Sequence, residues 1–395
     1  MTIAPIRPTV SRQDVIAKFQ EDLWLPDTGI IDVTLGSVAA NRMAGEPVWI
    51  MIVAASSAGK NIATGAVKAL PETHDVDSFS EAGLLSGSSD GTPGLLAQIG
   101  EYGIMVFPDF TVLISKGAPE RNSSFGGMRR IYDGAFDRRI GSKGGSLSWE
   151  GKIGCIAAVT PAVFLADMGV MGERFLYFPL PRASDTDRQL AGYSVLANHG
   201  HQPGQRSARA QLVADFFAGL ELPSKPPPLT ESDRDRLVLL ADLGSRGRSP
   251  VVRDRYRGDS IELTPEAEHP TRLLGALAQL ASGMRAVGTP EIDLWPLIAQ
   301  VAVGGIHPIR RRIIDMLVGG SAHHTTATIA ARCGLPHTTV RRHLEDLVAL
   351  GLLVLVALNP EQWNASDWLA ERWSTLAAGG MTPSVGGAVT SRRDP

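Results

Sequence analysis

The sequence predicts an α/β protein built on a parallel sheet, followed by two further modules that are mainly helical. Four short apolar runs, at 49–53, 104–107, 153–159 and 175–178, have the length and composition of strands buried on both faces. Helical patterns lie between these runs, and this alternation is typical of a sheet with crossover helices. The proline-rich segment 223–229 predicts a stiff, extended linker to the helical modules.

The composition fits a multidomain globular protein that has no strong overall charge. With 395 residues, of which 44% are hydrophobic and 20% charged, the chain can form two or three domains with proper cores. The net charge of −3 excludes a global positive field, so any DNA binding must come from a local patch. The two cysteines, Cys155 and Cys333, fit neither a disulfide framework nor a zinc site, which indicates a reducing compartment.

Targeting signals are not evident in the sequence. The first 15 residues lack the apolar run of a signal peptide. No stretch approaches the 18 or more consecutive apolar residues that a membrane-spanning helix needs. We therefore expect a cytoplasmic protein without a membrane partner.

A candidate phosphate-binding loop follows the first apolar run. The segment 54–61 (AASSAGKN) lies between that strand and a helical pattern at 62–70, which is the context of a Walker A motif. Backbone N–H groups of such a loop bind phosphate, and the lysine neutralises it. Two residues depart from the motif, since Ala54 replaces the first glycine and Asn61 replaces the hydroxyl residue. The residues expected to bind ATP are Ser56, Ser57, Ala58, Gly59, Lys60, Asn61 and Ile62. The alternative is a small-residue turn that leaves Lys60 merely exposed.

A second candidate element is the carboxylate that ends the second apolar run. Asp109 follows 104–107, and a strand that ends in a carboxylate is how P-loop enzymes hold Mg²⁺ or its water. We expect Asp109, together with Asn61, to contact the ion. No acidic residue follows Asp109, so the general base for hydrolysis is not obvious, and Glu101 and Glu120 are the candidates.

Seven stretches between residues 30 and 180 form an ordered set, at 56–60, 84–87, 108–111, 130–134, 149–152, 158–161 and 172–176. Together they resemble AAA-type P-loop ATPases carried by phages and mobile elements. The resemblance implies that Thr160 senses the γ-phosphate and that Arg174 is an arginine finger or a phosphate-sensing arginine. The alternative for Arg174 is an ion pair with Glu173 or another acid. Proteins of this kind usually form rings, so a homo-oligomer is also implied.

The helical stretch 230–285 is similar to the lid of AAA+ proteins. This similarity implies that Arg272, near the start of a helix at 271–284, returns to the nucleotide as a second sensor; the alternative is a solvated arginine. We expect Arg253, Arg255 and Arg257 to form a solvated or subunit-facing strip. The glycine-rich segment 83–94 predicts a flexible loop, one that could meet DNA in a ring pore.

The C-terminal module has the pattern of a winged helix-turn-helix. Helices are predicted at 307–318, 325–332 and 337–350, and an apolar strand at 352–357 follows Gly351. The pattern resembles ArsR/MarR-like bacterial regulators, which implies that the third helix reads DNA. Asn359 and Pro360 follow the strand closely, so we expect a short or missing wing. The residues expected at DNA are His337, Thr338, Thr339, Arg341, Arg342 and His343, and Arg310, Arg311 and Arg312 are candidates for backbone phosphates.

These features together predict an ATP-dependent protein that acts on DNA, such as a helicase, replication or remodelling factor of a mobile element. A rival hypothesis is a regulator that binds nucleotide without hydrolysing it and acts through the winged helix. Winged helices also serve as protein-binding modules, and a scaffold whose loop binds nothing is a further alternative. The predicted boundaries are 1–222 for the α/β core with its N-terminal helices, 229–303 for the lid, 304–360 for the winged helix and 361–395 for a helical and then disordered tail.

Overall fold

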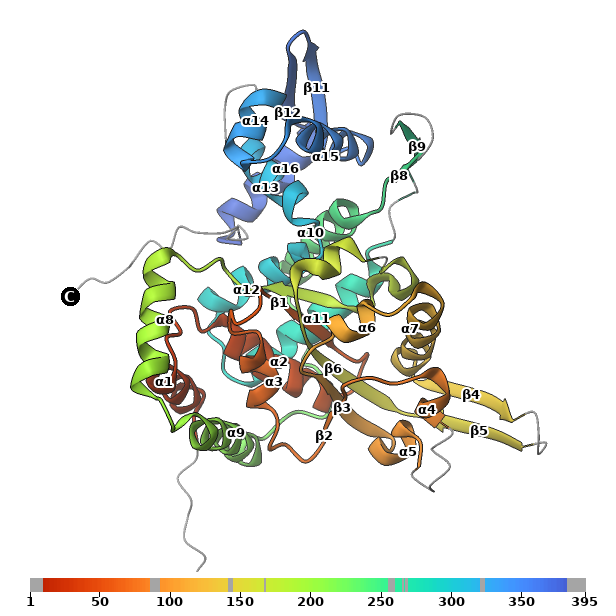
Figure 1. Ribbon diagram of the computed structural model, residues 1–395, viewed down its shortest axis with the longest axis vertical. Helices are drawn as coiled ribbons and strands as arrows, with labels where there is room; N and C mark the ends of the chain where they lie inside the picture. The colour runs from red at the N-terminus through yellow and green to blue at the C-terminus, as the bar shows by residue number, and fades with distance from the viewer. Residues whose placement is uncertain are drawn as a thin grey trace, which may run out of the picture. The chain divides into compact units, whose positions relative to one another are not determined.

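The first unit of the chain is built on a five-stranded sheet in which every neighbouring pair is parallel (Figure 1). The strand order is β2-β3-β6-β1-β7. The predicted parallel sheet is thus confirmed, and β2 is an additional strand. The strands are β1 (Trp49–Val53), β2 (Thr73–Asp75), β3 (Tyr102–Phe107), β6 (Lys152–Val159) and β7 (Leu176–Pro179).

The computed structural model describes residues 10–85, 93–140, 145–166, 168–254, 260–264, 266, 269–319 and 324–381. The chain forms two compact units. Unit 1 comprises residues 1–227 and 279–294, and unit 2 comprises residues 228–278 and 295–395. In the described part, no helix is long and apolar enough to cross a membrane.

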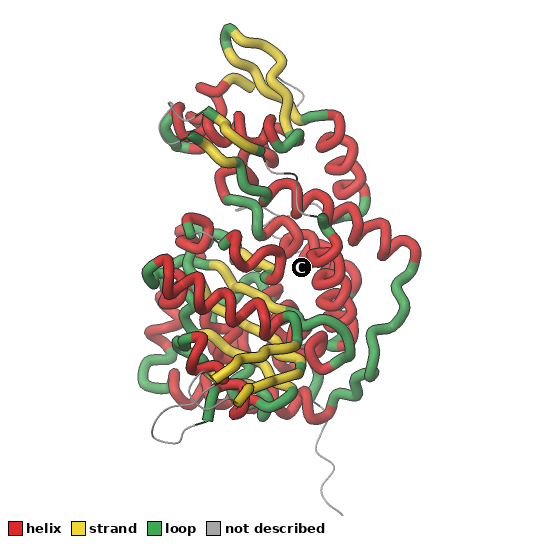
Figure 2. The backbone as a smooth tube through the Cα atoms, turned by 90° about the vertical axis from the view of Figure 1, so that its right-hand side faces the viewer, coloured by secondary structure: helices red, strands yellow, loops and turns green. Residues whose placement is uncertain are grey.

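Helices cover both faces of the sheet, because alternate residues of each strand point to opposite sides. On one face, Trp49 and Met51 join the core that α7 (Ala118–Tyr132) completes with Phe125. On the other face lies α2 (Gly29–Arg42), and its buried Asn41 hydrogen-bonds both backbone groups of Val48 at the start of β1. In Figure 2 the strands of this sheet are yellow and the helices around them are red.

Glycine at position 154 permits this close approach of helix and sheet. A Cβ atom on Gly154 would lie 2.3 Å from the side-chain nitrogen of Asn41. Any larger residue would therefore separate β6 from α2. The sequence at this point favours close packing over side-chain volume.

The remaining elements of unit 1 surround this sheet. The helix α1 begins after a capping box formed by Ser11 and Asp14. An antiparallel hairpin pairs β4 with β5 between α7 and β6. The bounds are α1 (Arg12–Asp22), α3 (Asn61–Ala66), α4 (Glu81–Leu85), α5 (Leu95–Ile99), α6 (Thr111–Ile114), β4 (Ala135–Ile140), β5 (Gly145–Glu150), η1 (Pro161–Leu165), η2 (Gly169–Arg174), α8 (Asp185–Ala197) and α9 (Gln202–Gly219).

Unit 2 is mainly helical, as predicted for the sequence after the proline-rich linker. Its elements are α10 (Glu231–Arg248), β8 (Val252–Arg253), β9 (Ile261–Leu263), α13 (Pro308–Val318), β10 (His324–Thr325), α14 (Thr326–Cys333), α15 (His337–Ala349), β11 (Leu353–Leu358), β12 (Glu361–Ala365) and α16 (Asp367–Ala378). Two further helices, α11 (Thr271–Ala286) and α12 (Glu291–Gly304), contribute residues to both units.

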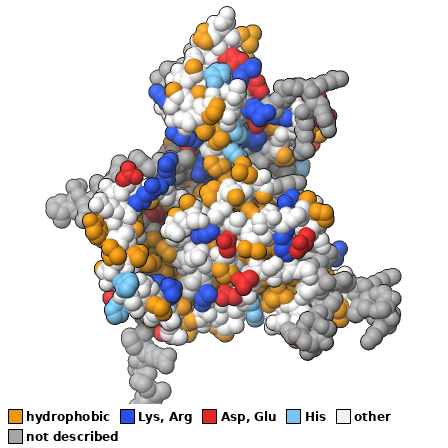
Figure 3. Space-filling view, viewed as in Figure 1, with side chains coloured by type: hydrophobic (Ala, Val, Ile, Leu, Met, Phe, Trp, Pro, Cys, Tyr) orange, Lys and Arg blue, Asp and Glu red, His pale blue; other side chains and the backbone are white. Residues whose placement is uncertain are grey.

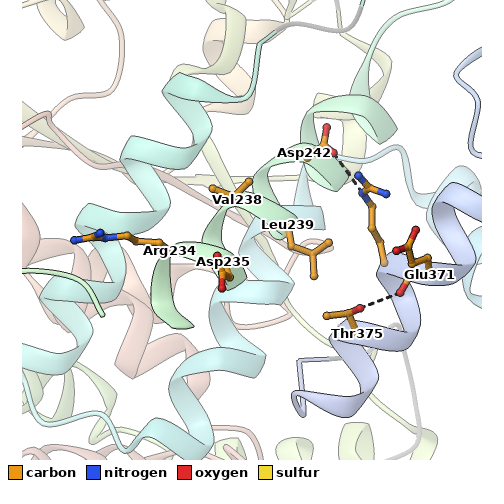
Figure 4. A pocket seen from close by; sticks show the side chains of 8 residues that line it. Arg234, Asp235, Val238, Leu239, Asp242, Glu371 and Thr375 are labelled. Atoms are coloured by element: carbon orange, nitrogen blue, oxygen red, sulfur yellow. Dashed lines mark hydrogen bonds and ion pairs between the residues drawn. The ribbon is translucent and has the colours of Figure 1, made fainter. Parts of the chain in front are cut away.

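Cation–π contacts at the ring of Trp368 join α10 to α16. The guanidinium of Arg246 lies 4.2 Å from the ring centre of Trp368, and that of Arg372 lies 4.1 Å from it. Arg372 also pairs with Asp242 at 3.4 Å, across an open groove between these two helices (Figure 4). Cation–π contacts of this kind stabilise each pair by about 0.5 to 2 kcal/mol.

The end of unit 2 has a complete wing, which corrects the expectation that the wing is short or missing. The strands β11 and β12 pair antiparallel, and β10 joins on the other side of β12. Asn359 and Pro360 form the turn of this hairpin instead of ending the module. A winged helix that ended at residue 360 would lose its central strand.

Candidate phosphate-binding and nucleic-acid sites

The loop that follows β1 has a backbone suited to binding an anion. Ser57 has a φ of +62° and Gly59 a φ of +88°, while Lys60 has a φ of −54°. Ser57 is the one non-glycine residue with positive φ among those described. Alternation of left- and right-handed residues turns successive N–H groups toward one point, which makes an anion-binding concavity. Strain of this kind is usually retained for a function.

Lys60 extends from this loop toward the end of β3. Its side chain is only 9% exposed, and its ammonium nitrogen lies 3.8 Å from Oδ1 of Asp109, whose side chain is 52% exposed. The interpretation of Lys60 as merely exposed is therefore wrong. The two groups are close enough to attract, yet the separation is longer than a tight ion pair.

A hydrogen-bonded pair of threonines extends the cluster to β6. The backbone N–H of Thr111 donates to Asp109 at 3.0 Å. The hydroxyl of Thr111 lies 3.4 Å from that of Thr160, and it accepts from the backbone N–H of Thr160 at the same distance. The structure thus brings Lys60, Asp109 and Thr160 to the carboxyl ends of β1, β3 and β6. Sequence reasoning missed Thr111 as the link, although an Asp-x-Thr spacing is a usual Asx-turn pattern.

The carboxylate of Asp109 is held in its charged form. Burial acts to raise the pKa of Asp109, but hydrogen bonds from Thr111 and the nearby charge of Lys60 outweigh it, so the pKa is lowered. A carboxylate that stays ionised while half exposed can accept the waters of a cation. Among the described residues, no three or more His, Cys, Asp or Glu side chains gather as metal ligands.

The other predicted loop residues are mostly exposed. Ser56, Ser57, Ala58 and Asn61 have exposed side chains, and Ile62 is half-buried. The exposed side chains are thus open to a ligand, and the loop backbone has the form suited to an anion. Asn61 begins the short helix α3.

Arg174 is bound elsewhere in unit 1. One of its terminal nitrogens donates to both oxygens of Asp133 at 2.9 Å, and the other donates to the carbonyl of Met171 at 3.1 Å. The side chain is only 6% exposed. This is the ion-pair alternative, with Asp133 as the acid instead of Glu173. A guanidinium so buried is poorly suited to reach a neighbouring subunit, so a finger role and a ring gain no support here.

The candidates for a general base lie away from the cluster or are paired. Glu101 lies at the amino end of β3, the opposite end from Asp109, and its carbonyl accepts from the N–H of Lys152. Glu120 is in the first turn of α7 and pairs with Lys116 at 2.8 Å. Neither position favours activation of water beside Asp109.

Arg272 is exposed in the first turn of α11. Its predicted role as a second sensor concerns a residue of unit 2 and a site of unit 1, and stays a prediction. Arg255, Arg257 and most of the glycine-rich segment 83–94 lie outside the described residues.

The nucleic-acid candidates lie on the third helix of the helix-turn-helix, α15. His337, Thr338, Arg341 and Arg342 are exposed, and Thr339 is half-buried. Residues in the first turns of such a helix reach base edges and phosphates in known complexes. Arg341 is partly neutralised, because it pairs with Glu361 of β12 at 3.0 Å and with Glu345 at 3.5 Å.

His343 faces the interior of unit 2. Its ring stacks on that of His307, with ring centres 4.8 Å apart and planes 24° apart. Burial lowers the pKa of His343 to about 4, and the positive groups around it act in the same direction. The ring is therefore neutral at physiological pH, and an inward ring is not placed to contact DNA.

Asp346 organises the arginines that the sequence suggested for other roles. It accepts from Arg253 of β8 at 2.7 Å and from Arg310 of α13 at 3.0 Å. Arg310 is buried and also donates to the carbonyl of Ser249 at 2.8 Å, so it is not available for backbone phosphates. Arg253 likewise holds α15 instead of forming a solvated strip. Arg312 donates to the carbonyl of Cys333 at 3.0 Å, at the end of α14.

Comparison with known proteins identifies one region of the chain. Residues 306–356 match a family of helix-turn-helix domains, which covers α13, α14, α15 and most of β11. No curated protein matches the chain. The C-terminal module is thus a helix-turn-helix domain, and DNA binding is the function it suggests. The resemblance of residues 30–180 to AAA-type ATPases stays a prediction.

Proposed function

We propose that this protein binds DNA through its helix-turn-helix domain and that ATP, bound at the carboxyl edge of the sheet in unit 1, drives or controls that activity. The observation that carries the nucleotide part is the convergence of Lys60, Asp109 and Thr160 from three parallel strands. In open α/β sheets, ligands bind outside the carboxyl ends of the strands.

Each member of the cluster has a definite task in this proposal. Backbone N–H groups between Ser57 and Lys60 would hold phosphate oxygens, and the ammonium of Lys60 would neutralise their charge. Thr160 would meet the terminal phosphate through its hydroxyl. Because Lys60 and Asp109 are separated by 3.8 Å, a phosphate can replace the carboxylate as the nearest anion to the ammonium.

Magnesium fits the donor set beside the phosphates. Mg²⁺ usually keeps several waters and takes one or two carboxylates together with phosphate oxygens, so a cluster of protein ligands is not required. Asp109 would hold the ion or its water, and the exposed amide of Asn61 would replace the usual hydroxyl. The ion would supply charge neutralisation at the phosphates.

The DNA part of the proposal follows from the family match and from the exposed residues at the start of α15. Basic and hydroxyl side chains there, on His337, Thr338 and Arg342, can contact base edges and phosphates in the major groove. Since the chain as a whole is slightly acidic, this local patch has to provide the attraction.

Equilibrium binding of a fluorescent ATP analogue with Mg²⁺ tests the nucleotide part. We expect Lys60→Ala to weaken binding at least tenfold, because the phosphate charge loses its nearest cation. The matched control is Lys68→Ala, since Lys68 is 51% exposed and pairs only at the surface with Asp75. Equal affinity of the Lys60→Ala variant and the wild type would refute a phosphate site here.

A second candidate is a regulator that binds ATP without hydrolysing it. The positions of Glu101 and Glu120 favour this candidate, because Glu101 lies at the opposite end of β3 from Asp109 and Glu120 pairs with Lys116. In that case nucleotide binding would change DNA affinity without turnover. Measuring DNA affinity with ATP, with ADP and with a non-hydrolysable analogue separates the two, since a binding switch responds alike to ATP and the analogue.

A further inference from the structure

Thr111 connects the two parts of the candidate phosphate site that come from β3 and β6. It begins the short helix α6, two residues after Asp109, and its backbone N–H donates to that carboxylate at 3.0 Å. Its hydroxyl accepts from the backbone N–H of Thr160 at 3.4 Å and lies at the same distance from the Thr160 hydroxyl. One residue therefore contacts both the proposed ligand of the metal and the proposed contact of the terminal phosphate.

The residue between Asp109 and Thr111 anchors this segment in the core. Phe110 is fully buried, and its ring packs edge-to-face on that of Phe175, with ring centres 5.5 Å apart. The backbone N–H of Phe110 donates to the carbonyl of Ala158 in β6 at 2.8 Å. The two polar residues that flank Phe110 are therefore fixed relative to β6, the strand that ends at the site.

The hydroxyl of Thr160 is not used by the helix that follows it. Thr160 is the N-cap residue of η1, with a φ of −84° and a ψ of 162°. Threonine hydroxyls at this position usually accept from a backbone N–H of the first turn. Here the hydroxyl makes no such bond and lies beside that of Thr111. Both side chains are half-buried, so a ligand can reach them.

A triphosphate carries one phosphate group more than a diphosphate, and the general charge of the protein does not select for it. The net charge of the chain is −3, and on the visible face basic and acidic side chains are interspersed among neutral ones (Figure 3). Such a surface adds little attraction for the extra negative charge. Selection therefore needs a contact that only the terminal phosphate makes, because a site built to hydrogen-bond one group disfavours an analogue that lacks it.

We infer, on the basis of the proposed nucleotide site, that Thr111 is a positioning residue that makes the site select ATP over ADP by fixing the Thr160 hydroxyl for the terminal phosphate. Both distances between the two threonines are 3.4 Å, longer than a tight hydrogen bond. Hydrogen bonds at such sites often shorten only in the complex with substrate. ADP lacks the group that Thr160 meets, so the pair of threonines contributes little to its affinity.

Equilibrium binding of fluorescent analogues of ATP and ADP to the full chain, both with Mg²⁺, tests the inference. Thr111→Val keeps the shape and the backbone N–H but removes the hydroxyl, so we expect it to weaken ATP binding by about fivefold or more and to leave ADP binding little changed. Thr111→Ser should restore ATP affinity, since serine supplies the hydroxyl. The matched control is Thr186→Val, because Thr186 is exposed on α8. Partial unfolding would weaken both nucleotides alike, so the ratio of the two affinities separates positioning from stability.

A double-mutant cycle shows whether the two threonines act together. Thr160→Val should weaken ATP binding to a similar extent, and the variant that carries both valines should lose little more than either alone. Losses that multiply, or a wild-type ratio of ATP to ADP affinity in Thr111→Val, would overturn the inference alone, provided that Lys60→Ala still weakens both nucleotides. A wild type that binds no nucleotide, or binding that Lys60→Ala leaves unchanged, would overturn the proposed site and this inference with it.

Discussion

Asp346 on α15 holds Arg253 and Arg310 at once, with Oδ1 2.7 Å from the first guanidinium and Oδ2 3.0 Å from the second. The three residues come from β8, α13 and α15, so a single carboxylate fixes the third helix of the helix-turn-helix to two other elements. All three side chains are at most 15% exposed. The orientation of the predicted DNA-reading helix therefore depends on a buried ionic cluster.

Removing this carboxylate should destabilise unit 2. Asp346→Ala leaves the buried Arg310 without its acid and Arg253 with Glu345 alone, and removal of one partner from a buried ion pair costs about 3 to 5 kcal/mol. Glu345→Ala should cost less than about 1 kcal/mol, because Glu345 is 30% exposed and pairs with Arg253 near the surface. Thermal unfolding of the full chain compares the two variants. Equal melting temperatures would show that the cluster does not hold α15.

The pair of stacked histidines should make stability depend on pH. Because burial lowers the pKa of His343 to about 4 in the folded protein, the unfolded chain binds more protons between pH 4 and 6.5. Stability from this group is thus present above about pH 6.5 and is lost as the pH falls toward 4, by about 2 to 3 kcal/mol. His343→Phe keeps a ring against His307 and should flatten the change in melting temperature over this range. An unchanged pH profile in the variant would refute the assignment.

Glu361 should act against DNA binding. Glu361→Gln removes the closer of the two carboxylates that pair with Arg341, so the charge of the arginine becomes more available to a phosphate. We expect the affinity for DNA to rise. The slope of the logarithm of affinity against the logarithm of salt concentration should become steeper by about one. Glu371→Gln serves as the control, since Glu371 lies in α16 and lines the groove opposite α10. DNA affinity is measured at several salt concentrations for each protein. The same salt dependence in Glu361→Gln and the wild type would contradict this role of Glu361.

Asp109 should determine the metal dependence of nucleotide binding. In Asp109→Asn the charged ligand for Mg²⁺ is lost, while Lys60 and the loop backbone remain. We expect the gain in ATP affinity on adding Mg²⁺ to fall at least tenfold, with affinity in EDTA little changed. Asp75→Asn, at an exposed ion pair, is the comparison. A full magnesium effect in Asp109→Asn would place the metal elsewhere.

The strands of the main sheet could be predicted because each is a continuous apolar run, buried on both faces. β2 could not, because its three residues, Thr73 to Asp75, are polar and partly exposed. Lys60 and Asp109 could be proposed from their places after two apolar runs, and the structure brings them within 3.8 Å of each other. The inward positions of Arg310 and His343 could not be proposed in this way, since the partner of Arg310 is Asp346, 36 residues along the chain on α15, and the partner of His343 is His307, before α13. Sequence spacing within one helix does not reveal an acid supplied from so far along the chain.

The complete wing was also not predicted from the sequence. Asn359 and Pro360 are typical of a break, and a break between two short strands is also how a hairpin turns. The strand β12 was missed because its sequence, EQWNA, has one large apolar residue, Trp363, and that residue alone is buried.

ATP hydrolysis by the purified full chain, with and without single- and double-stranded DNA, tests the central claim most directly. The account predicts turnover that DNA stimulates, that Lys60→Ala abolishes and that Lys68→Ala leaves intact. Turnover that survives Lys60→Ala would contradict the assignment of the site. Nucleotide binding with no turnover under any condition would contradict the motor and favour the regulatory switch.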